Sequence, residues 1–436
     1  MLLEADVVVI GSGSLGSSVA YHLAKSGKCR VALVDKSELA SQTSPRAAGL
    51  SGQIRHSELM TRLAVRGVER IARFAEETRE PMVFHQPGSL KIARRPEHEA
   101  QLGNEVALGR KLGLPIDFVA PHEAKRLMPF LETTGIRAIT YMQSDIYLEP
   151  GQLPLGYCRA AGRLGATLLP LTRVTAIAAP NGVVERVSTD RGEIRTPLVV
   201  DAAGAWVRAV ADLAGGSVPM VPTRHQLLTT EPLDGVRAEQ PITRIIDANV
   251  YIRPDNGGLM LGGYEANPLQ FEMRHLPPTF DVKDVPLDLG VLRNLAKQVH
   301  EQFPVFGNVN VREHRGGLPT MTPDGEHVIG TAPGVHGLFV VGGCCVGGLT
   351  IAPAIGELVA EWIASGEPPI DMSAMAPSRF ARGLSEDALK EACRWRYAHH
   401  YWSEQPCAKR WERPREPFAS GGIAQVAGRR GCEIRR

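Results

Sequence analysis

A buried strand, a glycine-rich turn, a helix and a second buried strand follow one another at the start of this chain of 436 residues. The first strand is predicted from the apolar run VVVI at 7–10, and the turn from GSGSLG at 11–16. Apolar residues then recur at helical spacing up to Leu23, Gly27 ends the helix, and VALV at 31–34 is the second strand. Continuous apolar runs of this length indicate strands buried on both faces of a parallel sheet, and so an α/β fold.

The turn carries the glycine spacing of a dinucleotide site. Gly11 makes the tight turn, Gly13 lets a pyrophosphate approach the helix N-terminus, and Gly16 allows close packing of helix and strand. Asp35 ends the second strand 24 residues beyond Gly11 (35 − 11) and can accept hydrogen bonds from ribose hydroxyls. The full unit predicts a bound dinucleotide, the alternative being a glycine-rich turn without a ligand. It does not separate NAD from FAD.

The composition argues against several other classes of protein, such as nucleic-acid-binding and membrane proteins. The chain is 43% hydrophobic and 22% charged with a net charge of +2, which gives no reason to expect a nucleic-acid or membrane partner. The length predicts two or three domains. No basic segment precedes an apolar run at the N-terminus, and the seven cysteines contain no CxxC pair. We therefore expect a cytoplasmic protein with reduced thiols and no metal site.

One uncharged stretch is long enough to be considered as a membrane span. Residues 337–356 read GLFVVGGCCVGGLTIAPAIG, with six glycines and one proline. The stretch changes from β-rich LFVV to a helix-like pattern, so strand, glycine loop and helix is the preferred interpretation. Cys344 and Cys345 in this loop are interpreted as small buried residues rather than as a redox pair.

Three segments together resemble a known family. They are LVVDAAGAW at 198–206, RGGLPTMTPDGEHVIG at 315–330, and the glycine-rich stretch that begins at Gly337. With the N-terminal unit, they resemble the FAD-dependent amine and amino-acid oxidoreductases, which include D-amino-acid oxidase, glycine oxidase, sarcosine oxidase and dimethylglycine dehydrogenase. The dimethylglycine and sarcosine dehydrogenase branch is the most similar, through AAGLSGQIR at 47–55, VPTRHQLLTTEPL at 221–233, LMLGGYEANP at 259–268, and the YAHHY and PREPF segments.

The resemblance implies a Rossmann-like, doubly wound FAD-binding domain interrupted by a substrate domain with a large mixed β-sheet. The FAD-binding domain would comprise 1–82, 146–218 and 318–370, and the substrate domain 83–145 and 219–317. The tail, 371–436, carries three of the five tryptophans, Trp395, Trp402 and Trp411. It either packs against its own FAD domain or docks a partner subunit. Larger relatives continue into a folate-binding domain.

The resemblance also assigns the cofactor. FAD is expected to contact Gly11, Gly13, Ser14, Leu15, Gly16, Asp35, Lys36, Arg46, Ala47, Ala48, Gly49, Leu50, Val174, Ala203, Gly204, Gly317, Gly343, Gly347, Gly348, Leu349 and Thr350. Arg46 stands where many relatives attach the flavin to a histidine, and Gly317 stands at about the place of the attaching cysteine in sarcosine oxidase. We therefore expect non-covalent FAD.

Three residues are the catalytic candidates that the resemblance implies. His225 and Tyr251 would face the flavin from the substrate domain, with histidine suited to proton handling by its ordinary pKa of about 6.5. Arg55 would bind the substrate carboxylate through two parallel hydrogen bonds. Sarcosine oxidases add a lysine to this carboxylate near the place of Thr350. They also have an oxygen-activating lysine at the place of Met260, and its absence favours an electron-transfer protein or quinone over oxygen as electron acceptor.

The implied reaction is oxidation of a secondary or tertiary N-methylated amino acid or related amine. Hydride passes from the carbon next to nitrogen to flavin, and the iminium hydrolyses to the demethylated amine and formaldehyde. Two alternatives stay open: a D-amino-acid or imino-acid dehydrogenase, and the flavin subunit of a hetero-oligomer that is inactive without its partner.

Overall fold

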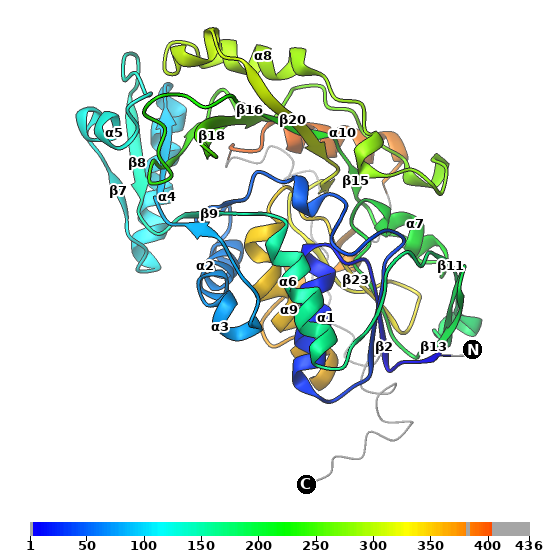
Figure 1. The fold of residues 1–436 in the computed structure, drawn as a ribbon. Coiled ribbons are helices and arrows are strands. Elements are labelled where there is room, and N and C mark those ends of the chain that lie inside the picture. Colours follow the sequence, from blue (N-terminus) through cyan, green and yellow to red (C-terminus); the bar gives the residue numbers. More distant parts are fainter. Residues whose placement is uncertain (1–2, 381–383, 403–436) are drawn as a thin grey trace.

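Two β-sheets form the body of the protein (Figure 1). The computed structural model describes residues 3–380 and 384–402. The first sheet has six strands in the order β10 (Thr167–Leu169), β3 (Val31–Val34), β2 (Val7–Ile10), β14 (Val199–Asp201), β23 (Leu338–Gly342) and β22 (Val328–Thr331). Its five neighbouring strands from β10 to β23 pair in parallel, and β22 is antiparallel to β23.

Each face of the six-stranded sheet is covered by a different layer. One face packs on the helices α1 (Ser14–Ser26), α2 (Glu58–Ala72), α3 (Phe74–Thr78), α6 (Gln152–Arg163) and α9 (Gly348–Ser365). The other packs on α7 (Val207–Asp212) and on a four-stranded sheet of β1 (Leu3–Glu4), β13 (Gly192–Arg195), β12 (Arg186–Thr189) and β11 (Val174–Ala178). Both faces are therefore buried, which explains the continuous apolar runs in these strands.

The second sheet is mixed and has eight strands. Their order is β20 (Val311–Gly317), β16 (His225–Thr230), β19 (Gly258–Gly263), β18 (Val250–Asp255), β17 (Ile242–Ile245), β6 (Ser89–Ala93), β8 (Ala138–Met142) and β7 (Ile116–Phe118). Only the β17–β6 pair is parallel among these described strands. Around it pack α4 (Pro96–Lys111), α5 (Pro121–Leu127) and α8 (Leu289–Gln298). We call this the substrate sheet.

Two small sheets lie between the large ones. They are β4 (Leu50–Ser51) with β9 (Ile146–Leu148) and β5 (Phe84–His85), and β15 (Val221–Pro222) with β21 (Thr320–Met321). All strands of the six-stranded sheet fall within the ranges expected for the FAD-binding domain, and all strands of the substrate sheet fall within 83–145 and 219–317. The α/β fold class predicted from the sequence is confirmed, while the domain boundaries themselves stay a prediction.

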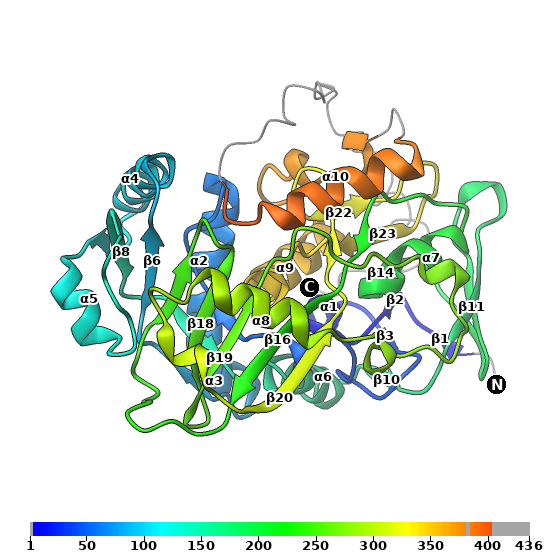
Figure 2. The same ribbon diagram turned by 90° about the horizontal axis from the view of Figure 1, so that it is seen from above.

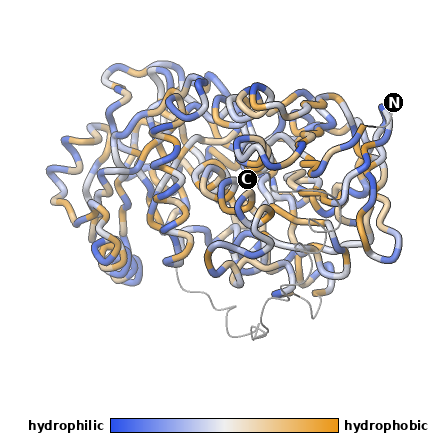
Figure 3. Tube along the Cα trace, turned by 90° about the horizontal axis from the view of Figure 1, so that it is seen from below, coloured by the Kyte–Doolittle hydropathy of each residue, from blue (hydrophilic) through white to orange (hydrophobic). Residues whose placement is uncertain are grey.

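Residues 337–366 form a strand, a glycine loop and a helix, β23 and α9, as the sequence indicated. Within the described residues, no helix is both long enough and apolar enough to cross a bilayer. Hydrophobic and hydrophilic stretches alternate along the trace (Figure 3).

The described part of the tail packs back onto this chain. Helix α10 (Glu386–Ala398) packs against β15 and β21, and the residues after it reach the substrate sheet. In Figure 2, α10 is the orange helix. Asn249 donates a hydrogen bond to the carbonyl of Ala398, and Gln101 donates one to the carbonyl of Tyr401. The described part of the tail therefore contacts β21, within the range expected for the FAD-binding domain, and also the substrate sheet. Trp411 and the PREPF segment lie outside the described residues.

Candidate active site

The turn after β2 uses its glycines for conformation and for close packing. Gly11 has φ of +100°, a region that favours glycine. A Cβ atom on Gly16 would lie 2.0 Å from the carbonyl oxygen of Gly11, and one on Gly11 would lie 2.5 Å from that of Ala202. The turn therefore touches both its own helix and the end of β14, where Ala203 and Gly204 follow.

The N-terminus of α1 is suited to an anion. Its N-cap residue, Gly13, has no side chain to cap the helix, and the first-turn N–H groups of a helix have no intrahelical partner. Ser14 N donates to Ser44 Oγ at 3.0 Å, while Leu15 and Gly16 follow in the first turn. Uncapped N–H groups and the helix dipole together fit a pyrophosphate.

Asp35 is held ready to accept further hydrogen bonds. Its Oδ2 accepts from Ser12 N at 2.8 Å and Ser12 Oγ at 2.6 Å, and its Oδ1 accepts from Ser37 N at 2.9 Å. Oδ1 has one further lone pair with which it can accept a hydrogen bond from a ribose hydroxyl. Val174 lies close by, because Thr172 N donates to the carbonyl of Asp35.

The side chain of Lys36 contacts residues that are distant in the sequence. Its ammonium lies 3.6 Å from Asp281 Oδ1 and 4.1 Å from the centre of the Trp206 ring. The side chain is therefore taken up by an ion pair and a cation–π contact, and only the backbone of Lys36 is left for the cofactor. The expected contact between Lys36 and FAD stays a prediction, and it would be made by the backbone.

The small-residue segment 46–50 is fixed by its neighbours. Arg253 Nε donates to the carbonyl of Ala48 at 2.7 Å, and Arg315 Nη2 donates to that of Ala47 at 3.4 Å. A Cβ atom on Gly49 would lie 2.1 Å from the carbonyl oxygen of Leu148, so the backbone of β9 is in direct contact with the backbone at Gly49. Leu50 pairs with β9. Arg46 has no carboxylate within 4 Å among the described residues.

A second helix N-terminus meets the first at this edge of the sheet. A Cβ atom on Gly348 would lie 3.5 Å from Ser14 Oγ, so α9 and α1 begin side by side. Gly343, with φ of +65°, directly follows the last residue of β23. Gly347 is the N-cap residue of α9, and Leu349 and Thr350 lie in the first turn of that helix. Gly317, at the end of β20, faces Thr43. Most of the residues expected to hold the cofactor thus gather at one edge of the six-stranded sheet, and they fit FAD.

His225 is held between two phenols. Its Nε2 lies 2.9 Å from Tyr251 Oη and its Nδ1 lies 2.8 Å from Tyr397 Oη. Burial lowers the pKa of His225 to about 4, so the ring is neutral at pH 7. The ordinary histidine pKa assumed from the sequence does not apply here. A neutral ring with both nitrogens engaged positions the phenols rather than storing a proton.

Aromatic rings gather around Tyr264. Its ring centre lies 4.9 Å from that of His225, 5.2 Å from Tyr397, 4.0 Å from His400 and 5.4 Å from Tyr401. We call these five residues, with Tyr251, the aromatic cage. Three of its six members come from α10 and the residues just after it. The YAHHY segment was expected only from the resemblance, and no role was predicted for its side chains.

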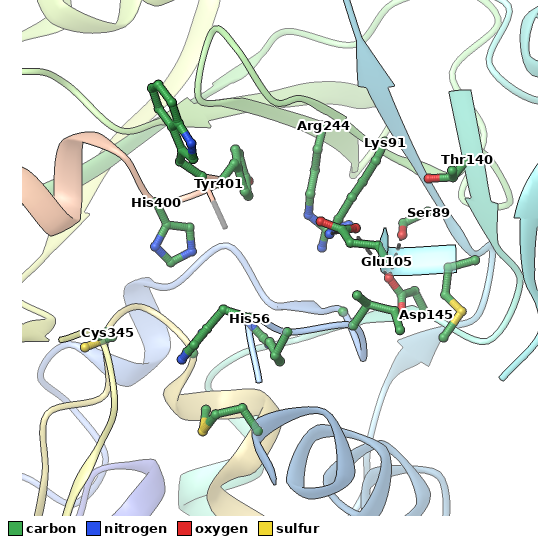
Figure 4. A pocket seen from close by; sticks show the side chains of 18 of the residues that line it. His56, Ser89, Lys91, Glu105, Thr140, Asp145, Arg244, Cys345, His400 and Tyr401 are labelled. Atoms are coloured by element: carbon green, nitrogen blue, oxygen red, sulfur yellow. Dashed lines mark hydrogen bonds and ion pairs between the residues drawn. The ribbon is translucent and has the colours of Figure 1, made fainter. Parts of the chain in front are cut away.

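A cavity opens between the substrate sheet and the segment after β4. Its lining includes Arg55, His56, Ser89, Lys91, Glu105, Thr140, Asp145, Arg244, His327, Cys344, Cys345, Gly347, Arg396, His400 and Tyr401. In Figure 4, Arg244, Lys91 and Thr140 extend from the sheet toward Asp145 and His56. His56 lies 2.8 Å from Glu326, and Lys91 lies 2.6 Å from Glu105. The cavity thus joins the glycine loop before α9 to the substrate sheet.

Arg55 enters this cavity without an acidic partner. Its Nη2 donates to Thr350 Oγ1 at 3.1 Å, its Nε donates no hydrogen bond within the described residues, and no described carboxylate lies within 4 Å. Burial and the nearby Arg244 charge lower the pKa of Arg55. A buried guanidinium without a carboxylate partner is suited to binding an anionic ligand.

Three buried histidines predict acid instability. Burial lowers the pKa of His22 and His327 to about 3 and that of His225 to about 4, whereas the unfolded rings bind protons near pH 6.5. Below that pH the unfolded state binds more protons, so the free energy of unfolding falls with pH, by about 2 kcal/mol per ring at pH 5. Urea unfolding at pH 7.5 and pH 5 would measure this loss. His327→Gln should lessen it, exposed His122→Gln should not, and equal loss in all three proteins would contradict the prediction.

The comparisons with known proteins agree with this geometry. Residues 6–362 match the model of the family described as "FAD dependent oxidoreductase" (DAO). The chain belongs to this family. As a DAO-family member it shares 32% identity with sarcosine dehydrogenase from Homo sapiens over 91% of this chain and 44% of the relative. It shares 28% identity with dimethylglycine dehydrogenase from Mus musculus over 90% of this chain and 46% of the relative. It therefore spans less than half the length of these curated relatives.

Solved structures of the DAO family have the same fold. L-proline dehydrogenase from P. horikoshii superposes with a TM-score of 0.78 at 26% identity, covering 88% of this chain and 99% of that one. The family is FAD-dependent, so the cofactor predicted from the sequence is confirmed as FAD. The role of each site residue stays a prediction.

Proposed function

We propose that this DAO-family protein oxidises the C–N bond of a secondary or tertiary N-methylated amino acid. The observation that carries the proposal is Arg55, a guanidinium without an acidic partner in the same cavity as the aromatic rings of His400 and Tyr401. A carboxylate on Arg55 would place the amine of the same molecule beside the cage. Aromatic faces favour methylated ammonium groups, and the names of the two curated dehydrogenases support this substrate class.

The chain's own groups would bind and orient this substrate. When bound, FAD accepts the electron pair of the C–H bond that breaks, and hydrolysis of the iminium by water gives formaldehyde and the demethylated amine. Arg55 fixes the carboxylate and Tyr251, held by His225, fixes the amine end. His400 lines the cavity, and its Nδ1 has no hydrogen-bond partner among the described residues. Burial holds the pKa of His400 well below its usual range, so its ring is neutral and available to accept a hydrogen bond from the amine.

The test is anaerobic mixing of the holoprotein with sarcosine and dimethylglycine. We expect flavin absorbance to bleach and formaldehyde to appear in equal amount. His225→Ala should retain flavin but reduce it about 10²-fold more slowly, because Tyr251 loses the partner that holds its phenol. Flavin-containing protein that no N-methylated amino acid bleaches would refute the proposal, and reduction at an unchanged rate in His225→Ala would refute the role of the pair. Readmitting air would show whether oxygen or another carrier, a protein or a quinone, is the acceptor.

A further inference from the structure

A row of side chains crosses the substrate sheet and leads away from the cage. Tyr251 on β18 lies directly opposite Arg244 on β17, Arg244 lies beside Lys91 on β6, and Lys91 lies opposite Thr140 on β8. Directly opposed residues share one face of a sheet, so these four residues face the same side. Neighbouring strands are about 4.8 Å apart, which places Arg244 one step and Lys91 two steps from the tyrosine.

Arg244 carries a positive charge that its surroundings balance incompletely. Its side chain is 8% exposed, its Nη1 donates no hydrogen bond within the described residues, and the only described carboxylate nearby is Asp145, with Oδ2 3.7 Å away. That distance exceeds a hydrogen bond. Asp145 is also committed elsewhere, because its oxygens accept from Gln53 N and Ser89 Oγ.

The charges around Arg244 leave the cavity cationic. Four of its lining residues are Arg or Lys (Arg55, Lys91, Arg244 and Arg396), and two are acidic (Glu105 and Asp145). Lys91 is paired with Glu105, and Arg396 interacts with Asp324 and Glu326. Burial keeps His327 and His400 neutral by lowering their pKa. Arg55 and Arg244 are therefore two buried guanidiniums, and among the described carboxylates only Asp145 lies within 4 Å of either, 3.7 Å from Arg244.

We infer that the cavity holds a substrate with two carboxylates, one on Arg55 and one on Arg244. The class is N-alkylated amino dicarboxylic acids, such as N-methylaspartate and N-methylglutamate, whose amine lies between the two anionic ends. Two substrate carboxylates would give each guanidinium a hydrogen-bonded anion, whereas an N-methylated glycine would leave Arg244 with only Asp145 at 3.7 Å and its Nη1 without a hydrogen bond. The inference rests on the proposed function, because the amine must sit beside the cage.

Equilibrium binding tests the second subsite without turnover. Succinate and glutarate, which have no amine, should perturb the visible flavin spectrum of the wild-type holoprotein at ~100-fold lower concentration than acetate and butyrate. Arg244→Gln should remove this preference, Arg244→Lys should retain part of it, and Arg137→Gln, an exposed charge on the same sheet, should leave it intact. Equal affinity of the wild-type protein for mono- and dicarboxylates would overturn the inference, whether or not the variants fold.

Flavin reduction separates this inference from the proposed function. N-methylaspartate or N-methylglutamate should reduce the wild-type flavin with a higher kcat/KM than sarcosine or dimethylglycine. In Arg244→Gln, kcat/KM should fall ~100-fold for the dicarboxylates and by less than ~3-fold for the monocarboxylates. Equal losses of kcat/KM for dicarboxylates and monocarboxylates would mean that both arginines bind the same carboxylate. That result would overturn the inference. Absence of reduction by every N-methylated compound, with the dicarboxylate preference in binding intact, would refute the proposed function alone.

Discussion

Protein carrying Gly16→Ala is expected to be purified without flavin. A Cβ atom at this position would lie 2.0 Å from the carbonyl oxygen of Gly11 and 3.0 Å from Ala202 Cβ. Both neighbours are held in the packed end of the sheet, so α1 must move away from β2 and β14, at a cost of several kcal/mol. That movement displaces the first-turn N–H groups from the pyrophosphate site, so visible flavin absorbance should be lost and unfolding should occur in less urea.

A glycine with open space around it supplies the control. Gly103 is in α4, and a Cβ atom there would meet nothing within 4 Å. Gly103→Ala should therefore retain flavin fully and stabilise the protein by about 1 kcal/mol through helix propensity. Gly16→Ala protein with a normal flavin content and an unchanged urea midpoint would show that the contact between turn and helix is not as close as described.

Arg55→Met is expected to keep its flavin and lose most of its activity. The guanidinium has no acidic partner in the chain, so its removal leaves no buried carboxylate unpaired, and the fold should tolerate it. The substrate carboxylate loses a charge-assisted, two-bond contact worth about 3 kcal/mol, which predicts a fall in kcat/KM of about 10²-fold. Steady-state kinetics with the best N-methylated substrate would measure it, alongside flavin content and the urea midpoint.

Two further variants separate charge from geometry at this position. Arg55→Lys should recover only part of the lost kcat/KM, because an ammonium cannot make two parallel hydrogen bonds to a carboxylate. Thr350→Val removes the hydroxyl that accepts from Arg55 but leaves the charge in place, and it should cost no more than about 10-fold. Unchanged kcat/KM in Arg55→Met would exclude the arginine from substrate binding.

The parts of the fold that sequence predicted well are those set by local pattern. β2, α1 and β3 follow the expected ranges, and Gly27, with φ of 64°, ends α1, because apolar periodicity and a left-handed glycine act over a few residues. β23 and α9 were predicted for the same reason. The side-chain partner of Lys36 could not be predicted, because Asp281 is 245 positions away (281 − 36) and no local pattern reports it.

The site was harder to predict for a related reason. Tyr397 contacts His225 across 172 positions, and His400 stacks on Tyr264 from the same distant segment. Arg244 carried a signal that was missed: a single arginine inside the apolar strand Ile242–Ile245 is a buried charge, and buried charges have partners or functions. The pKa of His225 could not be predicted either, since burial of the ring depends on the assembled sheet and helix.

The aromatic cage also imposes an order on biosynthesis. His225, Tyr251 and Tyr264 leave the ribosome more than a hundred residues before Tyr397, His400 and Tyr401. In the folded protein α10 packs on apolar side chains that include Leu227, Met260 and Met321. Before α10 is synthesised, these side chains lack that cover. A nascent or prematurely terminated chain thus exposes a hydrophobic surface at the future active site, where chaperones and proteases can distinguish it from finished protein. Helix α10 therefore covers this hydrophobic surface as well as closing the cage.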